Sequence, residues 1–245
     1  MARFDGLVVL VTGAGGGLGN AMADAFAAEG ARVIAADLDP DRIVTDAVVR
    51  AARLDVTREE EWVALLDGIA AAEGRIDVVV NNAGIFRPNI PFEEMPLSLW
   101  REHLAVNADG TFLGCKHGIL RMKGHGGAIV NIASGMGVRP VPTASAYCAS
   151  KAAVLMTTRT AAAAAGSYGI RVNAVLPGAV PTSMLMGNLQ PGQSEADLLA
   201  ILAGHSVLNR LATAGDIARA VLFLADPANS AITGVALPVD GGNLG

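Results

Sequence analysis

Residues 7–19 read LVVLVTGAGGGLG, an apolar run that passes directly into a glycine-rich turn. The run from Leu7 to Val11 predicts a buried strand, and the alanine-rich stretch from Leu18 to Glu29 predicts a helix that ends at Gly30. Glycines between a strand and a helix let the backbone approach a pyrophosphate, and the first turn of the helix offers it unpaired N–H groups. We therefore predict a dinucleotide site that uses Gly13, Gly15, Gly16, Gly17, Leu18 and Gly19.

The same alternation of short β-branched runs and longer amphipathic stretches continues along the chain. We expect further strands at residues 32–37, 53–56, 76–81, 127–134, 170–176 and 235–239. We expect further helices at residues 41–52, 58–72, 98–122, 145–166 and 213–225. Strands that alternate with helices lie parallel and are joined by right-handed crossovers. The predicted fold is α/β, a doubly wound Rossmann-type parallel sheet with helices on both faces, in one domain over residues 1–245.

The second predicted strand ends in Asp37, at the spacing where an acid meets the adenosine ribose. A carboxylate there accepts hydrogen bonds from the ribose hydroxyls and repels a 2′-phosphate. Neither Gly16 nor Leu38 supplies a positive charge that would hold such a phosphate. We therefore predict NAD as the cofactor, with Asp37 and Leu38 at its adenosine half. Helix capping is the alternative role of Asp37.

Composition narrows the classes of function. The chain has 245 residues and a formal net charge of −5, without a run of Lys or Arg, so the basic footprint of a nucleic-acid-binding protein is missing. The longest apolar stretches fall far short of the roughly 18 residues of a membrane-spanning helix, and residues 1–6 show no signal-peptide pattern. We expect a cytoplasmic protein that binds neither nucleic acid nor membrane. Two cysteines and four scattered histidines give no metal-ligand spacing, so no metal is expected.

Tyr147 and Lys151 lie one helical turn apart, so their side chains share one face of the predicted helix. A free tyrosine has a pKa near 10 and is a poor base at neutral pH. A nearby ammonium stabilises the phenolate, and lowering the tyrosine pKa to about 7 needs roughly 4 kcal/mol. The same pair also occurs on solvated helix surfaces.

The ordered set of motifs resembles the short-chain dehydrogenase/reductase family, in its single-domain form of about 250 residues, over essentially the whole chain. The matching motifs are Thr12 to Gly19, Asp55-Val56, Asn81-Asn82-Ala83-Gly84, Val106-Asn107 with Gly110, Asn131-Ile132-Ala133-Ser134, Tyr147 to Lys151, Pro177-Gly178 with Thr182, and Val239-Asp240-Gly241-Gly242. One departure is the segment between Asp37 and Asp55, which is short and leaves room only for a short helix.

The resemblance implies a role for each matching residue. Tyr147 would be the general acid/base, Lys151 would lower its pKa and bind the nicotinamide ribose, and Ser134 would donate to the carbonyl oxygen. Asn107 would kink its helix and hold a water that links Lys151 to solvent. Cofactor contacts would also come from Asp55, Val56, Asn82, Ala83, Gly84, Pro177, Gly178, Val180 and Thr182. The cofactor carries the hydride and the tyrosine handles the proton, so the chemistry needs no metal.

In such folds the ligand lies beyond the carboxyl ends of the strands. Besides Ser134 and Tyr147, we expect the pocket walls to be apolar and to include Met136, Met184 and Leu185. The stretch at about residues 178–206 is interpreted as a lid over the substrate, with an ungated surface excursion as the alternative. The substrate would be a neutral, mainly apolar secondary alcohol or ketone, although Arg87 and Arg139 leave a carboxylated one open.

The leading hypothesis is therefore an NAD(H)-dependent oxidoreductase that interconverts a secondary alcohol and a ketone. A 3-oxoacyl carrier-protein reductase and a sugar or polyol dehydrogenase share the motifs, and a non-catalytic NAD(H)-binding sensor or scaffold is the alternative outside enzymes. A small-residue face at Ala161–Ala165 permits close helix packing, so we expect a homotetramer or homodimer. The sequence leaves open the substrate itself, the physiological direction, the product stereochemistry and the pathway.

Overall fold

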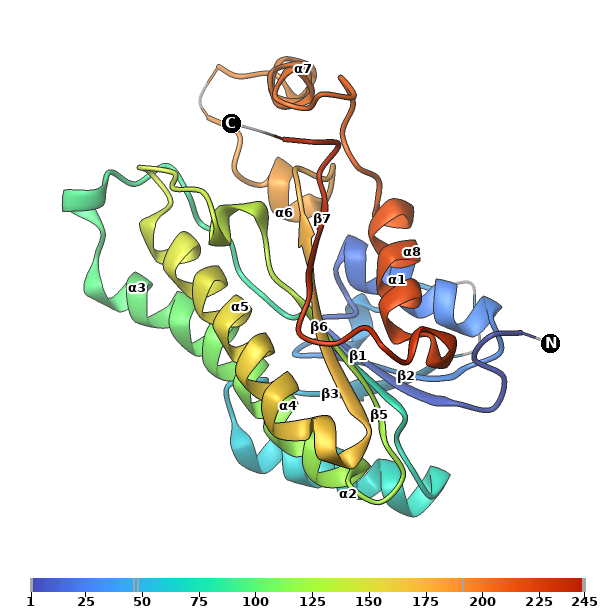
Figure 1. Cartoon of the computed structure of the whole chain (residues 1–245). Coiled ribbons are helices and arrows are strands. Elements are labelled where there is room, and N and C mark those ends of the chain that lie inside the picture. The colour runs from blue at the N-terminus through green and yellow to red at the C-terminus, as the bar shows by residue number, and fades with distance from the viewer. Residues whose placement is uncertain (1, 46, 48, 191, 244–245) are drawn as a thin grey trace.

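The computed structural model describes residues 2–45, 47, 49–190 and 192–243. Seven strands form one parallel sheet in the order β3-β2-β1-β4-β5-β6-β7 (Figure 1). The strands are β1 (Val8–Thr12), β2 (Arg32–Asp37), β3 (Val49–Arg53), β4 (Val78–Asn81), β5 (Gly127–Ile132), β6 (Ile170–Pro177) and β7 (Ala236–Val239). The strand order reverses between β1 and β4, which is where ligands bind in open sheets of this kind. The predicted α/β Rossmann-type fold is confirmed.

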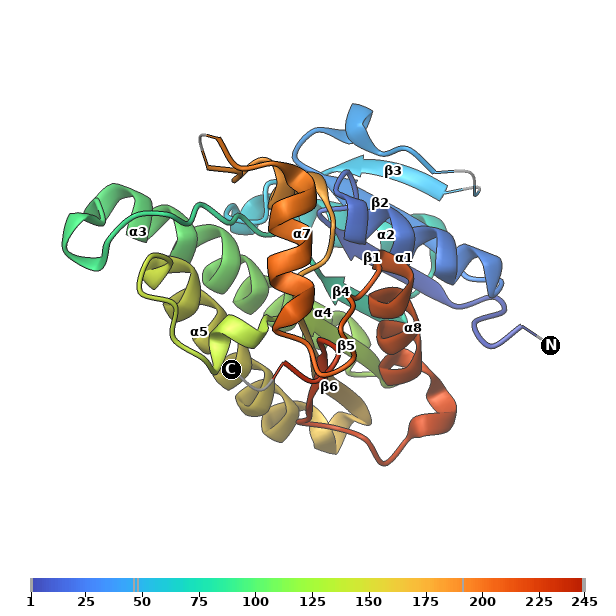
Figure 2. The same ribbon diagram turned by 90° about the horizontal axis from the view of Figure 1, so that it is seen from above.

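Helices cover both faces of the sheet. They are α1 (Gly17–Ala28), α2 (Glu59–Glu73), α3 (Leu97–His103), α4 (Gly110–Met122), α5 (Ser145–Ala165), α6 (Ser183–Met186), α7 (Glu195–Gly204) and α8 (Ala214–Ala225). Figure 1 shows α1 and α8 on one side of the sheet and α4 and α5 on the other. In Figure 2, α7 lies across the top of the molecule, between α5 and α8. No helix of the described residues is long and apolar enough to span a membrane.

Strand β1 shows why the strands read as continuous apolar runs. Val9 and Val11 belong to the core under α1 and α8, whereas Val8 and Leu10 belong to the core under α2, α4 and α5. Every residue of β1 is buried, because successive side chains point to opposite faces and both faces are covered. Each β1 valine that leaves water on folding contributes about 1.5–3 kcal/mol.

The prediction of a helix at residues 41–52 and a strand at 53–56 was wrong. The structure has a single 3-10 turn at Pro40–Arg42, followed by the edge strand β3, which pairs with β2 from Val33 opposite Val49. The connection at residues 38–48 must run back along β2, about 20 Å at 3.3 Å per residue. A helix rises only 1.5 Å per residue and would need about 13 residues for that distance, so the connection is too short to return as a helix, and its described residues 43–45 and 47 are not helical.

Candidate active site

The glycine-rich turn joins β1 to α1. Gly13 has a φ of +64°, and a Cβ at this position would stand 2.7 Å from Ala83 Cα. Gly16 precedes α1 without a side-chain capping hydrogen bond, and the first turn of α1 contains no acidic residue. The first N–H groups of the helix therefore have no side-chain partner and lie at the positive end of the helix dipole, which is the environment that binds a phosphate. Leu18 packs partly buried against the core and anchors this turn.

The end of β4 clamps the turn from the side. The Asn82 side-chain amide donates to Thr12 O at 2.9 Å and to Gly13 O at 3.0 Å. Thr12 Oγ1 accepts from the N–H groups of Asn82 and Ala83, each at 3.1 Å. The conformation of the turn is thus held by side chains that lie about 70 residues further along the chain.

The end of β6 closes the turn from the other side. A Cβ built on Gly17 would stand 3.3 Å from Thr182 Cγ2, so Thr182 lies against the start of α1. The Gly178 N–H donates to Val239 O at 3.1 Å, and a Cβ on Gly178 would meet Asp240 Cβ at 2.7 Å. Val180 is buried in the core below. The predicted residues from Pro177 to Thr182 therefore lie at the end of β6 and on the segment before α6, which packs against the first turn of α1.

Asp37 stands at the end of β2, as predicted. Its Oδ2 accepts from the Gly15 N–H at 2.9 Å and its Oδ1 from the Asp39 N–H at 3.1 Å. The carboxylate thus borders the glycine-rich turn, and Leu38 beside it is exposed. Arg42 also lies here and was not predicted from the sequence: a Cβ built on Gly15 would stand 2.8 Å from Arg42 Cβ. Only the shortness of residues 38–48 could have indicated it.

Asp55 and Val56 follow β3 and both have structural contacts. Asp55 Oδ1 accepts from the N–H and the hydroxyl of Thr57, at 3.0 and 2.7 Å, in the turn before α2. Val56 is buried, and a Cβ built on Gly110 would meet its Cγ2 at 2.9 Å. Their contact with the adenine stays a prediction.

Ser134, Tyr147 and Lys151 meet beyond the end of β5. Ser134 follows β5 and hydrogen-bonds to the Tyr147 side chain, while its Oγ accepts from the Met136 N–H at 3.1 Å. Lys151 Nζ lies 5.7 Å from the centre of the Tyr147 ring and donates to Ile132 O at 2.8 Å. One helix, α5, therefore presents the phenol and the ammonium together, and β5 supplies the hydroxyl.

Asn107 lies in a π-helical turn, Leu104–Asp109, that interrupts the predicted helix at residues 98–122 between α3 and α4. Its side chain is fully buried; Oδ1 accepts from the Ile85 N–H at 2.8 Å, and Nδ2 donates to Ile85 O at 3.0 Å and to Ser150 Oγ at 2.9 Å. The wider π-turn explains the expected kink, because it breaks the regular α-helical hydrogen bonding. The amide fixes the loop after β4 to α5. A Cβ on Gly84 would meet Asn107 Oδ1 at 3.0 Å and Lys151 Nζ at 3.5 Å, so this loop passes directly over both groups.

Burial acts on the two titratable groups in opposite directions. It raises the pKa of Tyr147 from 10.0 to about 12, against the opposing effect of the Ser134 hydrogen bond. Burial also lowers the pKa of Lys151 from 10.5 to about 8. The protein without ligands therefore holds a neutral phenol beside an ammonium that is still mostly protonated at pH 7. Perturbed groups of this kind gather at functional sites.

The entrance to this cluster is formed by two loops that the sequence analysis did not connect. The Phe86 ring packs edge-on against Tyr147, with centroids 4.7 Å apart. Asn188, which follows α6, donates to Phe86 O at 3.2 Å and to Met184 O at 2.7 Å. His103 is fully buried; its Nε2 accepts from the Arg87 N–H at 3.3 Å and its Nδ1 contacts Leu99 O at 2.9 Å.

Residues 178–206, which we expect to act as a lid, contain α6 and α7, and their role as a lid stays a prediction. Asn89 has a φ of +69°, donates to Asn188 O and accepts from Gln190, each at 3.2 Å. These amides hold the stretch against the loop after β4. Of the predicted pocket residues, Met184 is exposed and Leu185 and Met136 are half-buried.

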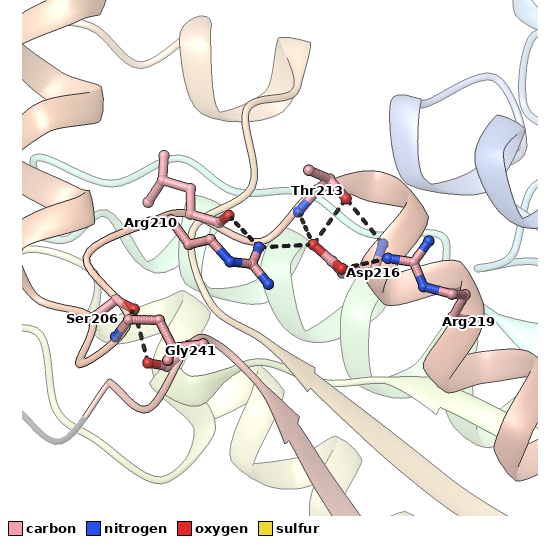
Figure 3. A network of polar contacts seen from close by, with 8 residues as sticks. Ser206, Arg210, Thr213, Asp216, Arg219 and Gly241 are labelled. Carbon is pink, nitrogen blue, oxygen red and sulfur yellow. Dashed lines mark hydrogen bonds and ion pairs between the residues drawn. The ribbon is translucent and has the colours of Figure 1, made fainter.

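A cavity of about 500 Å³ lies between the end of β7 and the start of α8. Figure 3 shows the charged network at its border, in which Asp216 binds Arg210, Arg219 and both the N–H and the hydroxyl of Thr213. These bonds form the capping box of α8 and lower the Asp216 pKa. Ser206, also in Figure 3, donates to Gly241 O at 2.8 Å and holds the C-terminal segment. The charges of this network therefore stabilise the fold around the cavity.

Known proteins match this chain over nearly its whole length. A family model described as enoyl-(acyl carrier protein) reductase matches residues 13–243. The chain is 40% identical to cis-4-hydroxycyclohexanecarboxylate dehydrogenase of Sinomonas cyclohexanicum over 96% of this chain and 95% of that protein. It is 39% identical to D-threitol dehydrogenase of Mycolicibacterium smegmatis over 98% of this chain and 94% of that one.

Solved structures also match this chain over nearly its whole length. The crystal structure of levodione reductase matches with a TM-score of 0.91 and 34% sequence identity, covering 98% of each chain. Both dehydrogenases named above act, by their names, on ring or chain compounds that carry hydroxyl groups. The similarity therefore extends over the sheet, the glycine-rich turn and the region around Tyr147.

Proposed function

The chain belongs to the short-chain dehydrogenase/reductase family, and from this premise we propose that it is an NAD(H)-dependent dehydrogenase that interconverts a secondary alcohol and a ketone. The observation that carries the proposal is the meeting of Ser134, Tyr147 and Lys151 beside the loop that passes over the glycine-rich turn. A proton-transfer group, a cation and a hydrogen-bond donor then face one reacting oxygen. This arrangement matches general acid–base catalysis with electrostatic support.

The residues present fit a nicotinamide dinucleotide. Gly13 and Gly17 let the turn pack against Ala83 and Thr182, the start of α1 lacks a side-chain cap, and Asp37 stands at the ribose position. The first turn of α1 would bind the pyrophosphate, Asp37 the adenosine ribose, and Lys151 the nicotinamide ribose. When bound, the coenzyme supplies the hydride donor and acceptor.

Tyr147 would transfer the proton at the substrate oxygen. When the alcohol is oxidised, the phenolate removes the proton of the alcohol hydroxyl. When the ketone is reduced, the phenol donates a proton to the ketone oxygen. Burial raises the Tyr147 pKa to about 12. Lowering it to about 7 then requires about 7 kcal/mol, at 1.36 kcal/mol per pKa unit. Lys151 supplies part of it as a positive charge 5.7 Å from the ring, and Ser134 as a donor to the developing oxyanion.

Asn107 would act through the loop that it holds. Its side-chain amide is saturated by Ile85 and Ser150, so its contribution is to position the backbone at Gly84 above Lys151. The proposed relay of protons from Lys151 toward solvent then depends on the main chain of the π-helical turn. On this ground we propose that Asn107 serves catalysis as a positioning residue.

NAD over NADP remains part of the proposal and is supported by Asp37. A carboxylate that already borders the Gly15 N–H would accept the ribose hydroxyls and repel a 2′-phosphate. The substrate class is proposed to be a cyclic or otherwise mainly apolar secondary alcohol. Phe86 supports it, because its ring packs on Tyr147, and Asn188 ties the Phe86 backbone to that of Met184. Together with Met136 and Leu185, these apolar side chains are proposed to form the wall that suits an alicyclic ring.

An assembly through α4 and α5 also remains a proposal. Phe112 and Leu120 on α4 and Met156 on α5 are each more than half exposed, although they are large and apolar. Large exposed apolar side chains on two neighbouring helices support an interface there. A second copy of the chain, packed on these helices, would give the homodimer or homotetramer that we expect.

The experiment that tests the function uses Tyr147→Phe beside the unchanged protein. NADH formation is followed at 340 nm with cyclohexanol, 4-hydroxycyclohexanecarboxylate, threitol and a 3-hydroxyacyl thioester, with NAD and NADP in parallel. We expect turnover of the cyclic alcohols with NAD, and a loss of several orders of magnitude in Tyr147→Phe with NADH binding retained. Binding of NADH without turnover of any substrate would instead favour a sensor or scaffold.

A further inference from the structure

The short connection between β2 and β3 brings a basic side chain to the adenosine end of the proposed coenzyme site. A Cβ built on Gly15 would stand 2.8 Å from Arg42 Cβ and 3.1 Å from Asp37 Cγ, so Arg42 and Asp37 flank the same glycine. The 3-10 turn at Pro40–Arg42 sets this position, with the Arg42 N–H donating to Asp39 O at 3.2 Å. A helix in this connection would have carried residue 42 away along the sheet.

The guanidinium of Arg42 is available to a ligand. Arg42 is exposed, and within the described parts of the chain it has no ion pair and no side-chain hydrogen bond. Arg53, which stands opposite Asp37 in the β2–β3 register, is instead bound to Glu61 at 2.7 Å. Arg42 is therefore the cation that can reach the 2′ side of the adenosine ribose.

We propose that Arg42 is a specificity-determining residue that, together with Asp37, sets the choice between NAD(H) and NADP(H). Asp37 binds the ribose hydroxyls and repels a 2′-phosphate, whereas Arg42 attracts that phosphate with a planar set of donors. The preference for NAD(H) is then smaller than Asp37 alone would impose. This inference rests on the proposed function, because it takes the glycine-rich turn as the dinucleotide site.

The carboxylates around Arg42 explain why NAD(H) is still preferred. Asp39 and Asp41 lie on the same turn, and the Asp39 side chain accepts from the Asp41 N–H at 3.3 Å. With Asp37, three acids lie within five residues of this arginine in the sequence, so we expect the local field to remain negative toward a phosphate. Arg42 reduces this repulsion without reversing it.

The test compares Arg42→Met with Arg50→Met. Both changes remove one exposed guanidinium and keep an unbranched stem, but Arg50 pairs with Ile34 near the start of β3, away from the end of the strand that pairs with Asp37. The dissociation constants of NADH and NADPH are measured for each protein by fluorescence titration at low salt. We expect Arg42→Met to weaken NADPH binding about tenfold and NADH binding less than twofold, whereas Arg50→Met leaves both unchanged.

The outcomes separate this inference from the proposed function. Equal weakening of both coenzymes, or no change for NADPH, would overturn the role of Arg42. Tighter binding of NADPH than of NADH by the unchanged protein, lost in Arg42→Met, would support Arg42 and overturn the proposed NAD preference. A protein that binds neither coenzyme would overturn both.

Discussion

Replacing Lys151 by Met should change how the stability of the fold depends on pH. Burial lowers the pKa of Lys151 from 10.5 to about 8, so between these values the unfolded chain carries a proton on this side chain that the folded chain does not. The free energy of unfolding therefore rises as the pH increases from about 8 to about 10.5. The whole shift corresponds to about 3 kcal/mol, of which about 2 kcal/mol develops between pH 7 and 9.5.

Lys151→Met removes this titration and keeps the aliphatic stem. The difference in free energy of unfolding, unchanged protein minus Lys151→Met, should increase by about 2 kcal/mol from pH 7 to 9.5, measured by urea denaturation at one protein concentration. Burial raises the pKa values of Tyr147 and Cys115 to about 12, so both groups lower the free energy of unfolding at higher pH. They do so in both proteins, and their contributions cancel in the difference. Lys123→Met, at an exposed position, is the control and should give a flat difference. A flat difference for Lys151→Met as well would refute burial of the ammonium.

Other changes test the lid, the core and the assembly. Asn188→Ala removes the hydrogen bonds that tie the lid to the loop after β4, so KM for the alcohol should rise several-fold with the NADH dissociation constant unchanged; a matching loss of NADH binding would contradict a lid role. Gly114→Ala would place a Cβ on Asn81 Oδ1 and should lower the free energy of unfolding by about 1–3 kcal/mol, whereas Gly68→Ala, with open space around it, should not; thermal and urea melts compare the two. Met156→Glu puts a charge on the apolar face of α4 and α5, so light scattering should report a smaller assembly, and an unchanged mass would place the interface elsewhere.

Most of the sheet could be predicted because its signals are local. The strand from Leu7 to Val11 and the helix up to Gly30 differ from the structure by a residue or two, since apolar periodicity and a glycine cap act within one element. The same holds for α5, where a spacing of four residues places Tyr147 and Lys151 on one face. The catalytic residues themselves were predicted because the ordered motifs resemble those of a known family, and the structure adds the distances between these residues.

The parts that could not be predicted depend on the lengths of connections and on contacts between distant loops. Residues 41–52 contain no glycine or asparagine, which favours a helix locally, but the connection is too short to return along β2 as a helix. Asn188 and Phe86 are 102 residues apart, and no pattern within either segment indicates that they meet.

For the same reason, only one of the two residues that we propose to set the choice of coenzyme could be predicted from the sequence. A carboxylate at the end of β2 lies in a position that the strand and the turn define together, so Asp37 can be placed by counting. Arg42 reaches the same ribose only because the chain turns back at Pro40, and this turn follows from the missing helix. The short connection therefore places a cation beside the glycine-rich turn. Lengthening the connection to restore a helix should therefore remove the effect of Arg42 on NADPH binding. Asp37 alone would then determine the preference between NAD(H) and NADP(H).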